Sequence, residues 1–232
     1  MPRSQTRGSN IGAFIRGWCN GSAHWLINNA YTNSTGLHVP TTCSYHSYYA
    51  DNTNVPAPNT SVSDAAIQNQ IKAAIAAGKL IYPNPFQVFV VFSDTKVNLG
   101  GGFGSQYCAY HGRFPYNGKA IIYAVMPYNA DFPFGCSTTG NGTEPTPNND
   151  YPADKEVNTL SHEIEEAATD PLLNAWYDAS GQENADKCVW TFGTTFNPGN
   201  GSQANVTFGS PSQNWLIQRN WALTPTQQCS LS

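Results

Sequence analysis

The stretch that decides the fold reads EVNTLSHEIEEAATD and runs from Glu156 to Asp170. Its apolar residues recur with the spacing of one stripe of a helix of 3.6 residues per turn, while the opposite side is acidic. The apolar residues are Val157, Leu160, Ile164, Ala167 and Ala168. The pattern predicts a helix with one side packed on a core and the other free for chemistry.

His162 and Glu166 are the candidate metal ligands on this helix. They are four residues apart, so their side chains lie one turn above the other and can reach one divalent cation. Glu163 lies beside them, about 100° around the helix axis. That position suits a general base that takes a proton from a metal-bound water.

A solvated helix face is the alternative, because a histidine among glutamates is common on surfaces and a bare HExxE pattern is weak. The scarcity of charge elsewhere favours the metal, since only 11% of the residues are charged. Crowded carboxylates repel one another unless a cation compensates them. Five acidic residues crowd here: Glu163, Glu165, Glu166, Asp170 and Asp178.

A third metal ligand has to come from the segment that follows the helix. Asp170 is about 12 Å from His162 along a continuous helix, but Pro171 disfavours helical geometry before it, so the chain turns there. The returning segment GQENADKC offers Glu183 and Asp186, of which we prefer Glu183 narrowly. Asp170 then completes the metal site indirectly, by orienting the histidine or fixing the turn.

Composition limits the remaining function classes. The 232 residues have a formal net charge of −4 and no run of Lys or Arg, which disfavours nucleic acid and anionic membranes as partners. No segment approaches the roughly 20 apolar residues of a membrane span. A chain of this length needs only one domain.

The cysteines point to an oxidising compartment. No CxxC pair is present, so structural disulfides are expected rather than a zinc ribbon or a redox centre. The N-terminal MPRSQTRGSN lacks the apolar stretch of a signal peptide. The chain is then either the mature form of a secreted, extracellular protein with an added Met or an intracellular protein, and the cysteines favour the first.

The flanking segments predict a mixed α and β fold. Residues 1–60 indicate an irregular, β-rich segment of short strands and loops. A helix is expected from residue 61, with Ser61 or Ser63 as N-cap and Gly78 as its end. Buried strands are expected at Phe86–Phe92 and Ala120–Met126, and loops at 100–104 and 137–153.

SHEIEEAATDPLLNAWYDASGQENADKC, residues 161–188, resembles the signature of the EXORDIUM or phosphate-induced protein family. Tyr107-Cys108-Ala-Tyr-His111 resembles its cysteine-aromatic-histidine motif, and the stretch from Trp215 to Trp221 with Cys229 is similar to its last strand and last cysteine. The resemblance covers roughly residues 86–232, and residues 1–60 do not visibly match.

The resemblance implies an extracellular protein linked in plants to cell-wall growth, and its HExxE helix implies a zincin-like fold. We therefore expect an α+β, zincin-like single domain, in which a mixed sheet has a backing helix and a metal-site helix. Residues 1–60 would form an N-terminal extension packed on the core, and residues 61–232 the metal-binding domain.

Glu166 stands where an ordinary zinc-peptidase HExxH motif has its second histidine. One histidine and two carboxylates neutralise a dication fully, so the bound water should be acidified less. Zinc is the cofactor that we expect first, and calcium or manganese are the alternatives because oxygen ligands suit harder ions.

The leading hypothesis is a secreted metallohydrolase, in particular a metallopeptidase, with Glu163 as general base. Tyr177 and His111 are the candidate donors to the oxyanion, although both residue types more often have structural roles. Its partner would be a peptide or a cell-wall or other extracellular polymer.

The second hypothesis is a non-catalytic matrix, wall-associated or self-assembling protein with a structural metal. A third, carbohydrate binding, rests only on tryptophans, which are mostly core residues in domains of this kind. The tryptophans concerned are Trp18, Trp25, Trp176 and Trp215.

Six cysteines allow fifteen pairings. We expect the pairs Cys19–Cys43, Cys108–Cys136 and Cys188–Cys229. The reasons are that paired cysteines lie near each other in the chain and that the last strand is expected to return beside the loop from Asp170 to Cys188.

Overall fold

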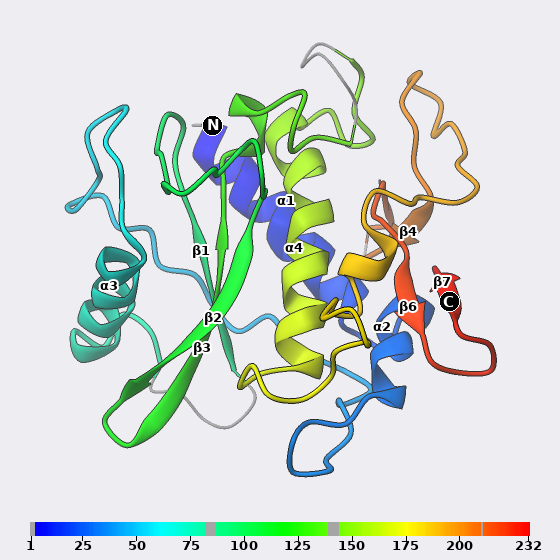
Figure 1. Cartoon of the computed structure of the whole chain (residues 1–232). Helices are drawn as coiled ribbons and strands as arrows, with labels where there is room; N and C mark the ends of the chain where they lie inside the picture. The colour runs from blue at the N-terminus through cyan, green and yellow to red at the C-terminus, as the bar shows by residue number, and fades with distance from the viewer. Residues whose placement is uncertain (1–2, 82–86, 139–143, 210) are drawn as a thin grey trace.

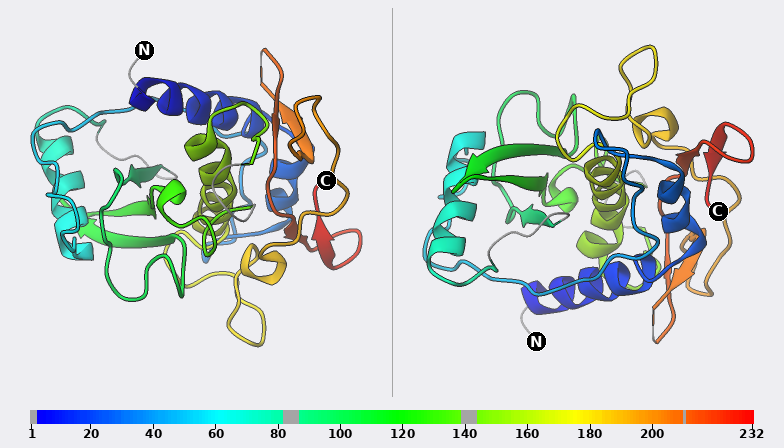
Figure 2. Two further views of the ribbon diagram at one scale, coloured as in Figure 1. Left: turned by 90° about the horizontal axis from the view of Figure 1, so that it is seen from above. Right: turned by 90° about the horizontal axis from the view of Figure 1, so that it is seen from below.

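A computed structural model describes residues 3–81, 87–138, 144–209 and 211–232. Figure 1 shows a small sheet at the centre, and the views in Figure 2 show helices α3 (Asp64–Ala76) and α4 (Tyr151–Thr169) on its opposite faces. Helix α1 (Arg3–Trp18) packs on the far side of α4. The mixed α+β architecture is therefore confirmed.

The sheet consists of β1 (Val88–Phe92), β2 (Tyr110–Tyr116) and β3 (Lys119–Met126) in the order β1-β3-β2. β1 runs parallel to β3, and β2 runs antiparallel to it. An Asn117-Gly118 turn with positive φ at both residues closes the β2–β3 hairpin. The hairpin pairs His111 with Ala124 and leaves β2 at the edge of the sheet.

The two strands expected from sequence are β1 and β3, and Phe86 lies outside the described residues. The expected backing helix is α3, which Ser63 caps by accepting a hydrogen bond from the Ala66 amide. Its three isoleucines belong to one core cluster with residues of all three strands.

Helix α4 starts five residues before the predicted Glu156. Asp150 caps it by accepting from the Ala153 amide, and Pro152 occupies the first turn, where no amide proton is needed. The helix ends at Thr169, before Pro171. Val157 and Leu160 are fully buried in a second core cluster between the sheet and α1.

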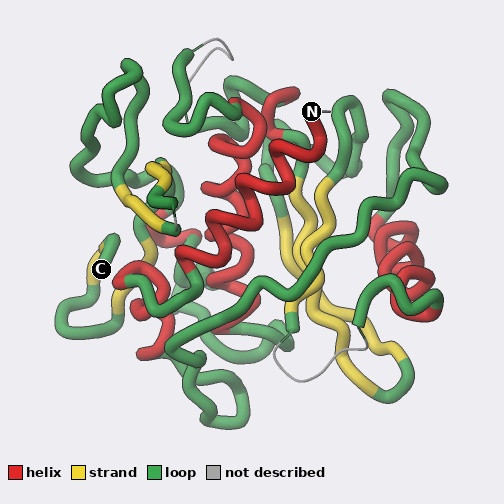
Figure 3. The backbone as a smooth tube through the Cα atoms, turned by 180° about the vertical axis from the view of Figure 1, so that it is seen from behind, coloured by secondary structure: helices red, strands yellow, loops and turns green. Residues whose placement is uncertain are grey.

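The prediction of a β-rich segment over residues 1–60 is wrong, because its first part is helical. Helix α1 is followed by α2 (Ala23–Leu26) and the 3₁₀ helix η1 (Ile27–Ala30). Residues 40–60 form an extended, largely irregular strap that crosses behind the sheet, as Figure 3 shows. The helical segment belongs to the same core cluster as α4.

The C-terminal quarter contains two small hairpins. β4 (Val206–Phe208) pairs with β5 (Gln213–Trp215), and β6 (Asn220–Ala222) pairs with β7 (Gln228–Ser230). The single strand expected at 215–221 is therefore wrong, since the chain leaves β5 and enters β6 through residues 216–219. Two further 3₁₀ helices are η2 (Asn129–Asp131) and η3 (Asp186–Cys188).

All three predicted disulfides are confirmed: Cys19–Cys43, Cys108–Cys136 and Cys188–Cys229. Within the described ranges, none of the helices has the length and hydropathy that a membrane crossing needs.

Candidate metal centre

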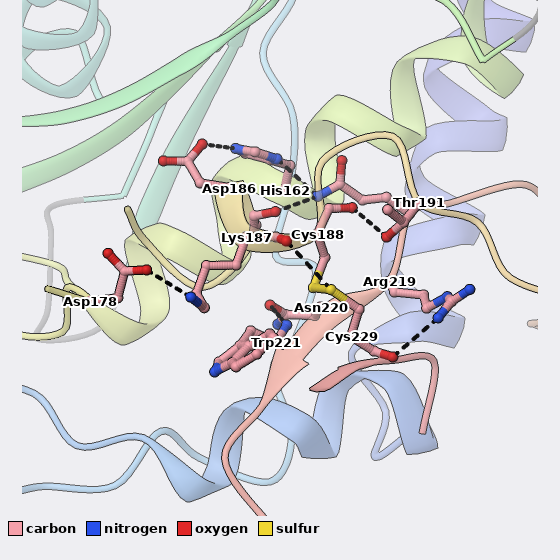
Figure 4. Close-up of a disulfide and its surroundings, with 12 residues drawn as sticks. His162, Asp178, Asp186, Lys187, Cys188, Thr191, Arg219, Asn220, Trp221 and Cys229 are labelled. Carbon is pink, nitrogen blue, oxygen red and sulfur yellow. Dashed lines mark hydrogen bonds and ion pairs between the residues drawn. A yellow bond between two sulfur atoms is a disulfide. The ribbon is translucent and has the colours of Figure 1, made fainter. Parts of the chain in front are cut away.

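His162 lies on the side of α4 that faces the returning loop. Its Nε2 is 3.0 Å from Glu166 Oε1 and 3.5 Å from Asp186 Oδ1. Figure 4 shows Asp186 pointing to His162 from the loop that the Cys188–Cys229 disulfide holds. His162, Glu166 and Asp186 thus form one compact group of possible ligand atoms, which we call the first trio.

A second trio consists of His111, Glu166 and Glu183. His111 reaches α4 from edge strand β2, and its Nε2 lies 3.1 Å from Glu183 Oε2 and 3.6 Å from Glu166 Oε2. Glu166 therefore belongs to both trios, with a different oxygen toward each histidine. Sequence reasoning named these side chains separately, and the fold brings them together.

Glu163 lies beside both trios. Only 5% of its surface is exposed, and none of the described residues donates a hydrogen bond to its carboxylate. Burial raises the pKa of Glu163 to about 8, against the opposing charge of His162 and with a further increase from Glu166. We call the two trios together with Glu163 the histidine–carboxylate cluster.

The two imidazoles respond to the carboxylates around them. Burial alone would lower the pKa of each, but the negative neighbours outweigh it. For His111 the hydrogen bond to Glu183 raises the pKa, and for His162 the charge of Glu166 raises it well above its usual value. The cluster therefore attracts positive charge, whether protons or a cation.

Asp170 fixes the turn at the end of α4 and does not approach His162. Its Oδ1 accepts hydrogen bonds from the backbone amides of Asn174 and Ala175 at 2.6 and 2.7 Å. Asp170 is fully buried, and its Oδ2 has no hydrogen-bond partner in the described parts of the chain. Of the two roles predicted for it, the geometry fits the turn.

Tyr177 follows on the same loop and is 41% exposed. Burial, together with the nearby Asp170 carboxylate and the charge of Glu183, raises the pKa of Tyr177. Its hydroxyl therefore stays protonated and can act as a donor at the rim of the cluster. Asp186 is 46% exposed at its side chain, so solvent reaches the cluster from this loop.

Two acidic residues counted in the sequence cluster lie elsewhere. Glu165 projects to the opposite side of α4, where its Oε1 is 3.0 Å from His24 Nδ1, and both side chains are buried. Asp178 pairs with Lys187 at 2.7 Å and accepts two loop amides. Neither can contribute to the trios.

Gln218 was not found by sequence reasoning. Its amide nitrogen donates to His162 Nδ1 and to the Ala185 carbonyl, both at 3.0 Å. The contact turns Nε2 of the ring toward the carboxylates. A glutamine in a C-terminal stretch, far from the helix in sequence, has no local signal for this role.

The donor set fits a divalent cation. Ligands at about 2.1 Å in tetrahedral geometry lie about 3.4 Å from one another. The histidine-to-carboxylate distances in the trios are 3.0 to 3.6 Å, and all ligand atoms of a trio lie within 4.8 Å of one another. Glu183 Oε1 is also buried and lacks a partner within the described residues. Imidazole nitrogens mixed with carboxylate oxygens suit zinc or manganese, and the oxygens alone suit calcium.

The cluster is separate from a cavity of about 1250 Å³ found on the other side of α4. Apolar residues of α1, α3 and α4 line that cavity, together with the strap, and no member of the cluster belongs to its lining. Of the tryptophans considered for carbohydrate binding, Trp18, Trp25 and Trp215 are buried in the core and present no free ring face.

Comparison with known proteins supports the resemblance noted in the sequence. The chain is 27% identical over 203 residues to the protein EXORDIUM-like 3 of Arabidopsis thaliana, covering 78% of this chain. It spans 56% of the length of that relative. No solved structure matches the chain.

The model of the phosphate-induced protein 1 conserved region matches residues 19–222. The match begins well before residue 86, so the expectation that residues 1–60 fall outside the resemblance is wrong from residue 19 onward. Helix α2, the strap and the core cluster under α3 lie within the matched range, whereas the α1 residues of the other core cluster precede it. The chain belongs to the phosphate-induced protein 1 family.

Proposed function

We propose that this protein is a secreted, cation-dependent hydrolase whose leading substrate class is the peptide. The observation that carries the proposal is the buried Glu163 carboxylate, which has no hydrogen-bond donor in the described residues and lies beside two histidine–carboxylate trios. An ionisable group held in this way is typical of a catalytic base.

His162, Glu166 and Asp186 would hold the cation. A ring that binds through Nε2 carries its proton on Nδ1, so the Gln218 amide would turn its oxygen toward Nδ1–H when the cation binds. A bound divalent cation supplies a Lewis acid that polarises a carbonyl and acidifies water. The preference for zinc over calcium or manganese remains part of the proposal. Asp186 replaces Glu183 as the third ligand of this trio, because its oxygen lies nearest His162 after Glu166.

Glu163 would accept the proton of the attacking water and return it to the leaving group. Tyr177 would donate to the oxygen on which negative charge develops, since its hydroxyl stays protonated. His111 is the other donor within reach, although its nitrogen is already turned to Glu183.

The position of β2 favours a peptide over other substrates. β2 pairs with β3 on one side only, and it carries His111 to the cluster. An extended peptide can add to such an edge through backbone hydrogen bonds. The three disulfides are consistent with a secreted protein, where such substrates occur.

Glu163→Gln is the test of the chemistry. The variant keeps the shape of the side chain but removes the base, so we expect peptide hydrolysis to fall about a hundredfold or more while bound zinc stays unchanged. Cleavage of a peptide library by mass spectrometry and metal content by elemental analysis measure the two quantities.

Glu165→Gln is the matched control, since Glu165 is a buried glutamate of the same helix that faces away from the cluster. It should keep hydrolysis in the fraction that folds. Full activity of Glu163→Gln, or no cleavage of any peptide by the zinc-loaded wild type, would contradict the catalytic proposal.

A non-catalytic matrix, wall-associated or self-assembling protein is the second candidate. Both trios join α4 to the loop that carries Glu183 and Asp186, so a cation there would fasten the loop to the helix whether or not catalysis occurs. In that case chelation lowers the thermal stability, and no peptide is cleaved at any cation load.

A further inference from the structure

The two trios share one residue, and each uses a different atom of it. Glu166 Oε1 faces His162 and Glu166 Oε2 faces His111. The remaining members do not overlap, because Asp186 belongs to the first trio and Glu183 to the second. This is the arrangement of a carboxylate that bridges two cations about 3.5–4 Å apart.

Each trio has the spacing of a cation site by itself. In the second trio, His111 Nε2 lies 3.1 Å from Glu183 Oε2 and 3.6 Å from Glu166 Oε2, close to the 3.0 and 3.5 Å of the first trio. Ligands around one ion are about 3.4 Å apart. The second trio therefore fits a cation as well as the first trio does.

The charge of the cluster is compatible with two cations. It contains four carboxyl groups and two imidazoles, and Glu163 and Glu166 are both at least nine-tenths buried. When the imidazoles are neutral ligands, two dications balance the four carboxylates.

Unpartnered oxygens provide a separate indication of a missing positive ligand. The Glu163 side chain, which is 5% exposed, lies among the charges of both histidines and of Glu166 and accepts no hydrogen bond from any described residue. Glu183 Oε1 is a buried oxygen without a hydrogen-bond partner in the described residues. A buried oxygen is normally hydrogen-bonded or bound to a cation.

We propose that the cluster holds two divalent cations, with Glu166 bridging them, His162 and Asp186 completing one position, and His111 and Glu183 completing the other. The inference rests on the proposed function for its first position and adds the second. It makes His111 a ligand rather than an oxyanion donor, which leaves Tyr177 as the donor at the rim.

Zinc stoichiometry is the first test. The wild-type chain, dialysed against Zn²⁺ and measured by elemental analysis, should bind two ions. Glu183→Gln and His111→Ala should each bind one, Asp186→Asn should bind one, and the exposed His46→Ala is the control that should keep two. Thermal unfolding of each variant in excess Zn²⁺ confirms that the counted chains are folded.

The outcomes separate the two proposals. One ion in the wild type that is lost in Asp186→Asn but kept in His111→Ala and Glu183→Gln overturns the second position and leaves the proposed function standing. No bound ion in the wild type overturns both. A protonated His111 paired with Glu183 would then serve as the internal counter-charge.

Adjacency is tested by Mn²⁺ loading. Two Mn²⁺ ions bridged by one carboxylate couple magnetically, so the wild type at two equivalents should give the multiline electron paramagnetic resonance spectrum of an exchange-coupled pair. Glu183→Gln at one equivalent should give the six-line spectrum of an isolated ion. Isolated spectra in the fully loaded wild type would show that Glu166 does not bridge.

Discussion

At the residue scale, Glu163 is the position at which stability and the proposed chemistry oppose each other. Its carboxylate is buried without a hydrogen-bond donor from the described residues, and the pKa of about 8 expresses the cost of charging it there. If this position had only a structural role, an apolar side chain or a glutamine would give a more stable fold. Sites that trade stability for function are expected to contain such residues.

The pH dependence of stability follows from this shift. The folded-state pKa of Glu163 lies above the ordinary value of 4.5. The contribution of the protonated Glu163 to the stability of the fold is therefore fully present below pH 4.5 and is lost as the pH rises toward 8. In chelator, Glu163→Gln should therefore be more stable than the wild type by about 4 kcal/mol at pH 8, with little difference at pH 4.5.

Urea unfolding of both proteins in EDTA at the two pH values measures this difference. Glu165→Gln is a useful comparison on the same helix. Glu165 is fully buried, its oxygens lack a hydrogen-bond partner in the described residues, and burial raises its pKa as well, so this variant should also gain stability as the pH rises. A gain for Glu163→Gln that is the same at both pH values would show that Glu163 does not titrate in this range.

Local spacing predicted only part of the site. His162, Glu163 and Glu166 follow from helical geometry, and the loop ligands from the return after Pro171. The pairing of His111 with Glu183 joins residues 72 positions apart. Gln218 is 56 positions from its histidine. The periodic patterns of the sequence do not indicate these long-range contacts, because the contacts depend on how the sheet and the loops pack.

At the element scale, helix α1 shows why residues 1–60 were wrongly predicted to be β-rich. In α1 the residues Ile11, Phe14, Ile15 and Trp18 have helical spacing and are buried, but polar residues and glycines surround them. Gly17 is explained by packing, since a Cβ there would lie 2.4 Å from the Gly209 amide nitrogen.

Strand β2 was hidden for a different reason. Gly112 and Pro115 both disfavour a strand interior, and only the following Asn117-Gly118 pair signals a hairpin. Proline is tolerated here because β2 is an edge strand. The element that carries His111 was therefore the least visible of the three strands.

The Cys188–Cys229 disulfide gives an element-scale prediction about cation affinity. Asp186 and Cys188 lie on the same short helix η3, which the disulfide fastens to β7, as Figure 4 shows. Replacing both cysteines by serine should free this loop and weaken Zn²⁺ binding about tenfold, equivalent to about 1.4 kcal/mol of lost preorganisation.

Removing Cys19–Cys43 in the same way is the control. That disulfide joins the end of α1 to the strap, so it should lower stability without changing the affinity of the folded protein for Zn²⁺. Calorimetric titration with Zn²⁺, at a temperature where both variants are folded, measures the two affinities. Equal losses of affinity in the two variants would mean that the η3 loop is positioned without its disulfide.

At the scale of the whole molecule, the chain packs as layers whose core includes both ends of the sequence. Phe14 contacts Trp18, Phe208 and Trp215 in one aromatic group. Asn28 Oδ1 accepts a hydrogen bond from Asn184, which lies between Glu183 and Asp186 in the loop after α4, and another from Asn220 in β6. These contacts join residues before position 60 to the same core as α4 and the C-terminal hairpins.

The final prediction concerns a chain that starts at residue 61. It lacks the α1 and α2 side of the core, and it leaves the buried Glu165 without His24. Losing Phe14 and Trp18 alone costs about 3–5 kcal/mol each, against a total stability of about 5–15 kcal/mol for an ordinary domain. We expect this chain to show no cooperative urea transition, weak near-ultraviolet circular dichroism and no stoichiometric Zn²⁺ binding.

Point variants of the full chain provide the control for this prediction. Phe14→Ala should lower the free energy of unfolding by about 3–5 kcal/mol. Phe134→Ala changes a side chain that is 84% exposed and should lower it by almost nothing. A cooperative transition in the shortened chain would mean that residues 61–232 form a domain of their own and that the N-terminal helices only cover it.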